Sequence, residues 1–106
     1  MAHTVKEKKH LEKVARLGCI ICRKQGFYFV PAELHHIRDI KITGLGQRAS
    51  HFQVIPLCVK HHRLGKEAFH YSKKNFTAKW GTQLQLLAET EELLKKDLYE
   101  VFYDDS

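Results

Sequence analysis

The sequence lacks several features that would place it in whole classes of protein. It contains no run of 18 or more apolar residues, so we expect no transmembrane helix. The lysine-rich stretch 1–13 lacks the apolar block of a secretory signal. It has only three cysteines, an odd number that fits a disulfide framework poorly. We therefore expect a cytoplasmic, intracellular protein whose cysteines stay reduced and bind a metal.

The bulk composition is that of a small globular protein with an excess of positive charge. At 43% hydrophobic and 28% charged residues, the 106-residue chain is not expected to be disordered. We predict a single domain over 1–106 that would benefit from a structural metal, because its core is small. Lysine and arginine number 18 against 12 acidic residues, a net charge of +6. Such a balance is typical of nucleic-acid-binding proteins, although many basic proteins bind none.

The three cysteines and one histidine form two spaced pairs. Cys19 and Cys22 have the C-x-x-C spacing, and Cys58 and His61 have the C-x-x-H spacing. Structural zinc takes four nitrogen or sulfur ligands in a tetrahedron, and these two pairs supply four. The alternative, that Cys19 and Cys58 are merely buried apolar residues, is disfavoured because the paired spacing is specific.

The first half of the chain predicts a helix, a metal-binding turn and a two-stranded ribbon. Thr4 and Glu7 form a capping-box pattern before a helix over about 5–17, which Gly18 should end. Residues 19–26 resemble a tight knuckle that holds two thiolates. Strands are expected over about 33–37 and 52–57, joined by a long loop. These predictions give a small α+β fold.

Helices are predicted in the second half. One helix should begin near Cys58 or Val59 and pause around Gly65. The aromatic residues Phe69, Phe76 and Trp80 then recur at helical spacing up to a stop at Gly81. A second capping-box pattern over 82–85 opens a last helix with a leucine-rich stripe. The apolar positions of that stripe are Leu86, Leu87, Leu93, Leu94, Leu98 and Val101.

Histidines beyond the predicted zinc site suggest a second metal. His35 and His36 are adjacent on a predicted strand, so their side chains should point to opposite faces. His62 follows the zinc ligand directly, and His70 comes eight residues later. An open metal site needs such neutral imidazoles together with free positions for water and substrate. The alternative is that these are surface or core histidines with no shared role. His51 fits phosphate contact and strand capping equally well.

This arrangement of residues resembles the HNH endonucleases, whose fold is called ββα-metal. The likeness is closest to the nuclease domain of the phage recombination enhancement function (Ref) family, which are RecA-dependent nucleases. It covers roughly residues 15–95. The residues that carry it are Gly18-Cys19-x-x-Cys22, Pro31-Ala32-Glu33-x-His35-His36-Ile37, Gly44-x-Gly46-x-Arg48-Ala49-Ser50-His51-Phe52, Ile55-Pro56-Leu57-Cys58-x-x-His61-His62-Arg63, Ala68-Phe69-His70 and Gly81-Thr82-Gln83.

The resemblance implies a role for each matching residue. His36 is expected to be the general base that takes a proton from water. The expected ligands of a catalytic Mg²⁺, Mn²⁺ or Zn²⁺ ion are His35, His62 and His70. Arg48 and Arg63 are expected to contact DNA phosphates, and His51 is a further candidate for such a contact. One departure is Gln53, which stands where an HNH nuclease usually has asparagine.

The sequence therefore leaves two alternative functions open. The first is a metal-dependent DNA endonuclease or nickase, encoded by a phage or prophage and acting as a monomer. The second is a non-catalytic, zinc-stabilised module that binds nucleic acid through its basic face. The resemblance also makes RecA a candidate partner. However, the relatives carry a long basic N-terminal extension, and only about a dozen residues precede the core here, so RecA dependence does not transfer with the motifs.

Overall fold

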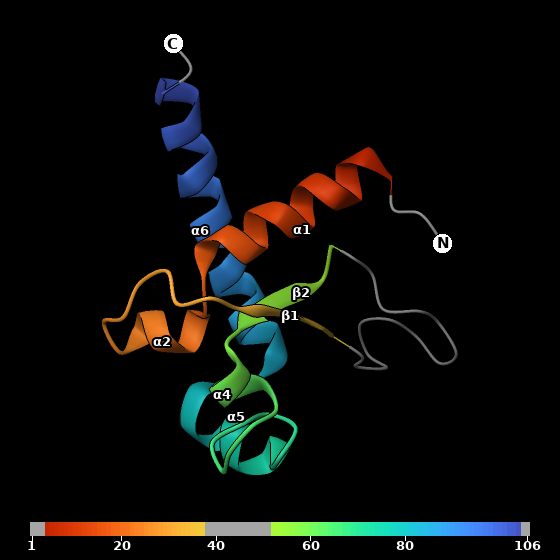
Figure 1. Ribbon diagram of the computed structural model, residues 1–106, viewed down its shortest axis with the longest axis vertical. Coiled ribbons are helices and arrows are strands. Elements are labelled where there is room, and N and C mark those ends of the chain that lie inside the picture. The colour runs from red at the N-terminus through yellow and green to blue at the C-terminus, as the bar shows by residue number, and fades with distance from the viewer. Residues whose placement is uncertain (1–3, 38–51, 105–106) are drawn as a thin grey trace.

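The fold is a small α+β arrangement in which helices surround a two-stranded sheet, as the sequence predicts (Figure 1). The computed structural model describes residues 4–37 and 52–104, with side chains described up to residue 96. The elements in chain order are α1 (Val5–Leu17), α2 (Ile20–Lys24), β1 (Glu33–His36), β2 (Val54–Leu57), α4 (Val59–His62), α5 (Lys73–Trp80) and α6 (Gln83–Asp104). None of the helices among the described residues is long and apolar enough to cross a membrane.

Helix α1 has the bounds and the cap that its sequence predicts. The Thr4 hydroxyl accepts from the Glu7 backbone N–H at 3.1 Å, and the Glu7 carboxylate accepts from the Thr4 N–H at 3.0 Å. These two bonds satisfy N–H groups that the start of a helix leaves free. Val14 and Leu17 are buried, and Gly18 ends the helix with φ of 75°. Helix α1 therefore reaches Cys19 with a fixed direction.

The antiparallel sheet separates two layers of the core. Strand β1 pairs with β2 so that His35 lies opposite Ile55 and His36 lies opposite Val54. Alternation along a strand puts Leu34, His36 and Val54 on one face of the sheet and His35 and Ile55 on the other. Leu34 and Val54 pack with residues of α1, whereas Ile55 packs with the cysteine-containing segments. The sheet thus carries its two adjacent histidines on different faces.

Helix α6 joins the two core layers. Its start follows the predicted capping box, since Thr82 and Gln85 exchange side-chain and backbone hydrogen bonds of 2.8 and 3.1 Å. Leu86 and Leu87 pack in the layer that holds the cysteines, and Leu94 packs in the layer under α1. The side chains of Leu98 and Val101, also expected on this stripe, lie outside the described residues.

Three sequence predictions need correction. The two strands begin and end within the predicted ranges but are shorter, at four residues each. The knuckle at Cys19 contains a five-residue helix, α2, before it turns at Gly26. Phe69 does not belong to a helix: α5 begins only at Lys73, where the Ser72 hydroxyl caps the Asn75 N–H. The helical spacing of the aromatic residues is misleading there, because Phe69 lies in a turn and reaches the core from outside α5.

Candidate metal centres

The first candidate centre, the cysteine cluster, consists of the four predicted zinc ligands. Cys19 caps the start of α2 and Cys22 lies within it, whereas Cys58 caps the start of α4 and His61 lies within that helix. All four residues are buried, and one ligand atom from each lies within 4.8 Å of all the others. The cluster ties α2 to α4 on the side of the sheet that carries His35.

The distances within the cysteine cluster match those of a tetrahedral site. With Zn–S near 2.3 Å and Zn–N near 2.1 Å, tetrahedral ligands lie about 3.8 Å apart for two sulfurs and about 3.6 Å for sulfur and nitrogen. The Cys22 and Cys58 sulfurs are 3.7 Å apart. His61 Nδ1 lies 3.7, 3.6 and 3.2 Å from the sulfurs of Cys19, Cys22 and Cys58. The four atoms can therefore hold one metal ion with little movement.

The electrostatics of the cysteine cluster also favour a cation. Burial raises the pKa of the Cys19 thiol, and burial together with the charge of Cys19 raises the pKa of Cys22 to about 12. Burial lowers the pKa of His61. The protein alone thus keeps these side chains neutral, and only a positive ion could hold several thiolates so close together. The His61 Nε2 atom is buried and has no hydrogen-bond partner among the described residues.

The backbone before Cys19 is shaped to close the cluster. The Cys19 N–H donates to the Val30 carbonyl at 2.8 Å, and the Cys22 N–H donates to the Cys19 sulfur at 3.4 Å. A Cβ atom on Gly18 would lie 2.7 Å from the Phe29 Cα and 2.8 Å from the Val30 oxygen. Gly18 is therefore needed both for its positive φ and for this close approach of two chain segments.

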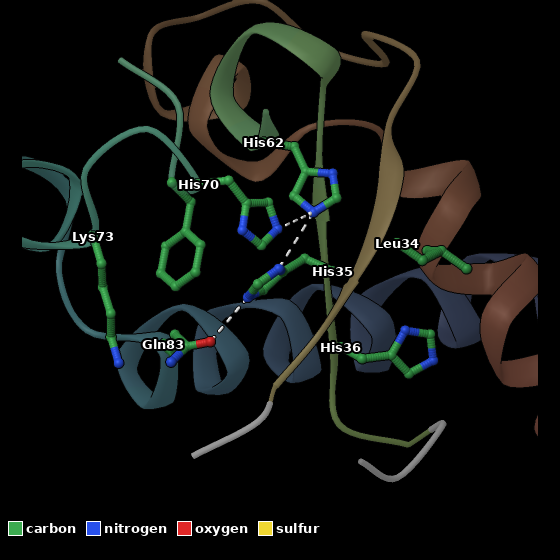
Figure 2. Close-up of a pocket in the computed structure, with 8 residues that line it drawn as sticks. Leu34, His35, His36, His62, His70, Lys73 and Gln83 are labelled. Carbon is green, nitrogen blue, oxygen red and sulfur yellow. Dashed lines mark hydrogen bonds between the residues drawn. The ribbon is translucent and has the colours of Figure 1, made fainter. Parts of the chain in front are cut away.

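The second candidate centre, the histidine trio, consists of His35, His62 and His70. His35 comes from β1, His62 from α4, and His70 from the turn that follows α4. The three side chains point toward one another (Figure 2), with one nitrogen of each within 4.8 Å of the others. His35 is buried, His62 is half-buried and His70 is exposed, so the trio opens toward solvent.

His70 reaches the trio because the chain folds back along α4. The Phe69 N–H donates to the His61 carbonyl at 2.8 Å, and the His70 N–H donates to the His62 carbonyl at 3.0 Å. The Phe69 ring also packs on the His35 ring with centroids 4.5 Å apart. The backbone that carries a cysteine-cluster ligand thus also fixes the place of His70.

The nitrogens of the trio have the spacing of metal ligands. His62 Nε2 lies 3.4 Å from His35 Nδ1 and 3.1 Å from His70 Nε2. Imidazole nitrogens bound at about 2.1 Å would be about 3.4 Å apart in a tetrahedron and about 3.0 Å apart at right angles. Both observed distances fall within this range. The trio can therefore bind an ion from one side and leave its other positions open.

Two side chains orient the trio from outside. His62 Nδ1 lies 2.8 Å from Glu33 Oε1, and His35 Nε2 lies 2.9 Å from Gln83 Oε1. Both oxygens accept hydrogen bonds, so each histidine places its N–H there and turns a lone pair toward the centre of the trio. Such partners are a regular feature of histidines that bind metals.

Burial and neighbouring charges favour the states of His35, His70 and Glu33 that a metal requires. Burial lowers the pKa of His35 to about 4, and burial with the charge of His62 lowers the pKa of His70. The Arg63 guanidinium and His62 lower the pKa of Glu33 to about 2, so this carboxylate stays an acceptor. Neutral imidazoles and an ionised carboxylate are the states that suit cation binding.

A cavity of about 340 Å³ lies over the trio. Its lining comprises Leu34, His35, His36, His62, Phe69, His70, Lys73 and Gln83. The cavity therefore offers a positively charged side chain, several imidazoles and an amide to a ligand. Figure 2 shows that His36 leaves the strand on the other side from His35, beside Leu34. The expected general base thus borders the same cavity as the trio without belonging to it.

Of the three residues expected to bind DNA, only Arg63 is among those that the structure describes. Arg63 lies at the C-cap of α4, and its Nε and NH2 groups donate to the Glu33 carboxylate at 2.9–3.0 Å. The side chain is nevertheless 52% exposed. Its role as a phosphate contact stays a prediction. Arg48 and His51 lie outside the described residues. Gln53 is half-buried, and its backbone carbonyl accepts from the Ile37 N–H at 3.0 Å.

The sequence alone predicts no role for Glu33 or Gln83, although each contacts the trio. Both residues lie in motifs that carry the resemblance to HNH nucleases, and this resemblance is the sequence feature that indicates a role for them. Their partners are 29 and 48 residues away in the chain, so no local spacing reveals the contacts.

Fold and site together define a class: a small α+β domain with one closed and one open set of metal-ligating side chains. Residues 3–95 match the family described as "Recombination enhancement, RecA-dependent nuclease". The chain belongs to this family, as its sequence motifs predict. A nuclease role follows from that membership. No curated protein matches the chain.

Proposed function

We propose that this protein is an HNH endonuclease or nickase that hydrolyses DNA phosphodiester bonds with a divalent cation held by His35, His62 and His70. The cysteine cluster is proposed to hold a structural zinc ion, and His36 is proposed to be the general base. Within the cell, the family description makes RecA the candidate partner. Arg48, Arg63 and His51 keep their proposed role as contacts to DNA phosphates.

One observation carries the proposal: three imidazole nitrogens lie close together, and acceptors hold the outer nitrogens of two of these histidines, His35 and His62. Surface histidines without a shared role would have no reason to be oriented by both Glu33 and Gln83. The cysteine cluster already contains four ligands. The trio is therefore surplus to structural needs, which argues against a purely structural zinc module.

The chemistry suits the residues around the cavity. A bound divalent cation would supply positive charge beside the scissile phosphate and the leaving 3′ oxygen. His36 would accept the proton of the attacking water, whose oxygen forms the new bond to phosphorus. The P–O3′ bond breaks, and the 3′ oxygen takes a proton from solvent. Lys73, which lines the same cavity, would attract the phosphate.

A nicking assay tests the proposal. The purified protein is incubated with supercoiled plasmid or single-stranded DNA and with Mg²⁺, Mn²⁺ or Zn²⁺, each with and without RecA filaments. We expect cleavage with at least one of the three metals. Intact DNA in every arm, under conditions where binding is demonstrated, would contradict the nuclease proposal and favour the zinc-stabilised binding module.

Variants can distinguish a role of His36 as general base from a role in folding. We expect His36→Ala to lower the cleavage rate by about 10²–10⁴-fold, which is the usual contribution of a general base. Its zinc content and thermal unfolding should match those of the unmodified protein. Tyr71→Ala is the matched control, because Tyr71 is an exposed ring beside His70 that does not line the cavity. Equal losses in the two variants would argue against a base at His36.

A further inference from the structure

A second cavity, of about 270 Å³, lies away from the histidine trio along helix α1. We call it the lysine groove, and its lining comprises Lys6, Lys9, His10, Lys13, Phe52 and Leu94. No residue of this groove lines the cavity over the trio. Neither the metal centres nor the proposed hydrolysis uses it.

The lysines of the groove share one side of α1. Positions 6, 9 and 13 fall within about 60° of one another around a helix of 3.6 residues per turn. Among the described residues, no carboxylate forms an ion pair with any of these three lysines. The other side of the helix carries Lys8 and Glu12, which are exposed. Three adjacent cations on an exposed face of a helix favour the approach of an anionic ligand.

The floor of the groove is aromatic. The Phe52 ring is 45% exposed, and the His10 ring lies against it with centroids 5.2 Å apart. Burial, the largest cause, lowers the pKa of His10 from its ordinary value, and Glu91 partly opposes this shift. A half-exposed aromatic ring between lysines is the combination that single-stranded nucleic acids use, with bases on the ring and phosphates on the cations.

The groove also lies on the side of the sheet that carries His36. Leu34 and Val54 pack under α1, and strand alternation places His36 on the same face as Leu34. Phe52 comes two residues before Val54, at the end of β2 that pairs with His36. A strand that leaves the trio past His36 would therefore meet Phe52 and then the lysines of α1.

We propose that the lysine groove binds the backbone of an unpaired DNA segment next to the one being cut. Lys6, Lys9 and Lys13 hold successive phosphates, and Phe52 stacks with a base. This inference deepens the proposed function, on which it rests for the identity of the bound polymer. It assigns to α1 a substrate-binding role in addition to covering the sheet.

The test measures how binding depends on salt. A fluorescein-labelled single-stranded DNA is titrated with the full chain by fluorescence anisotropy over a series of KCl concentrations, without added divalent metal. The variant is Lys6→Gln/Lys9→Gln/Lys13→Gln, and the matched control is Lys8→Gln/Lys66→Gln/Lys96→Gln. Both remove three charges from exposed or half-exposed sites that take no part in the ion pairs of the described residues. Glutamine keeps the helix propensity of lysine, so both variants should fold.

We expect the groove variant to reduce the slope of log K against log salt by about 2, since each phosphate contact on a single strand contributes about 0.7. The control should reduce the slope by less than half of that. Phe52→Leu should keep the slope but weaken binding to single-stranded DNA by about 5- to 100-fold, with a smaller effect on duplex DNA.

An unchanged slope in the groove variant, or an equal change in the control, would overturn the inference. Loss of binding to RecA filaments with DNA binding intact would also overturn it and point to an acidic protein surface instead. Failure of the nuclease proposal is a separate result. In that case the protein cuts no DNA with any metal, yet the groove variant still changes the slope.

Discussion

The two ligand sets share helix α4 and yet differ in burial, in the number of ligands and in access to solvent. The cysteine cluster is buried, offers four ligand atoms and lies in the main hydrophobic core. The histidine trio has three ligands, opens into a cavity and ranges from buried to exposed. His61 and His62 are consecutive residues of α4 and belong to different sets. One closed site can therefore fix the helix that presents a ligand to the open one.

Removal of a cysteine-cluster ligand should have the largest effect. Structural zinc adds about 10–16 kcal/mol in small zinc peptides, which equals or exceeds the stability of a typical domain. We expect Cys22→Ser to abolish the cooperative thermal transition seen by circular dichroism and to lose the bound zinc in elemental analysis. A variant that kept a melting temperature within a few degrees of the parent would show that the cluster does not hold the fold.

Removal of a trio ligand should affect cleavage and leave the fold intact. We expect His62→Ala to lower the cleavage rate by about 100-fold or more, because one of three ligands to the cation is lost. Its zinc content and melting temperature should stay close to those of the parent. The comparison between the two sets fails if His62→Ala unfolds the protein as Cys22→Ser does.

Substitution of the residues that orient the trio should have the next largest effect. Gln83→Leu removes the acceptor for His35 Nε2 and should lower metal affinity or activity by about 10- to 100-fold. Gln83→Glu keeps an acceptor at the same place and should recover most of this loss. Isothermal titration with Mn²⁺ gives the affinity directly. Equal losses in both variants would mean that Gln83 acts through packing rather than through its carbonyl oxygen.

The smallest effect concerns the glycine that closes the cysteine cluster. Gly18 and Gly26 both have positive φ, so alanine at either should cost about 1–2 kcal/mol. Only at Gly18 would the new Cβ meet backbone atoms, at 2.7–2.9 Å, whereas Gly26 has open space. Denaturant unfolding of the zinc-loaded protein should therefore show a greater loss for Gly18→Ala by about 1 kcal/mol or more. The reverse order would contradict the close approach described at Gly18.

The sequence predicts the parts of the molecule that depend on local chemistry. Capping boxes at Thr4 and Thr82 mark the starts of α1 and α6, because a cap involves residues only three apart. The paired C-x-x-C and C-x-x-H spacings likewise predict the cysteine cluster, since each pair spans one turn of chain.

Other parts of the molecule depend on contacts that form between different segments only when the chain is folded. Phe69 appears helical by spacing, but backbone bonds to the carbonyl oxygens of α4 hold this segment in turns outside α5. The same bonds bring His70 to His62, which spacing alone could not fix. Glu33 and Gln83 reach their histidines only through tertiary contacts, so their roles need the folded structure.

The most direct test of two metal centres with different tasks is a crystal of the protein grown with zinc and soaked in Mn²⁺. Anomalous difference maps recorded on both sides of the zinc edge would separate the two metals. We predict zinc among Cys19, Cys22, Cys58 and His61, and manganese bound by His35, His62 and His70. Manganese peaks elsewhere, with none at the histidine trio, would contradict the central claim.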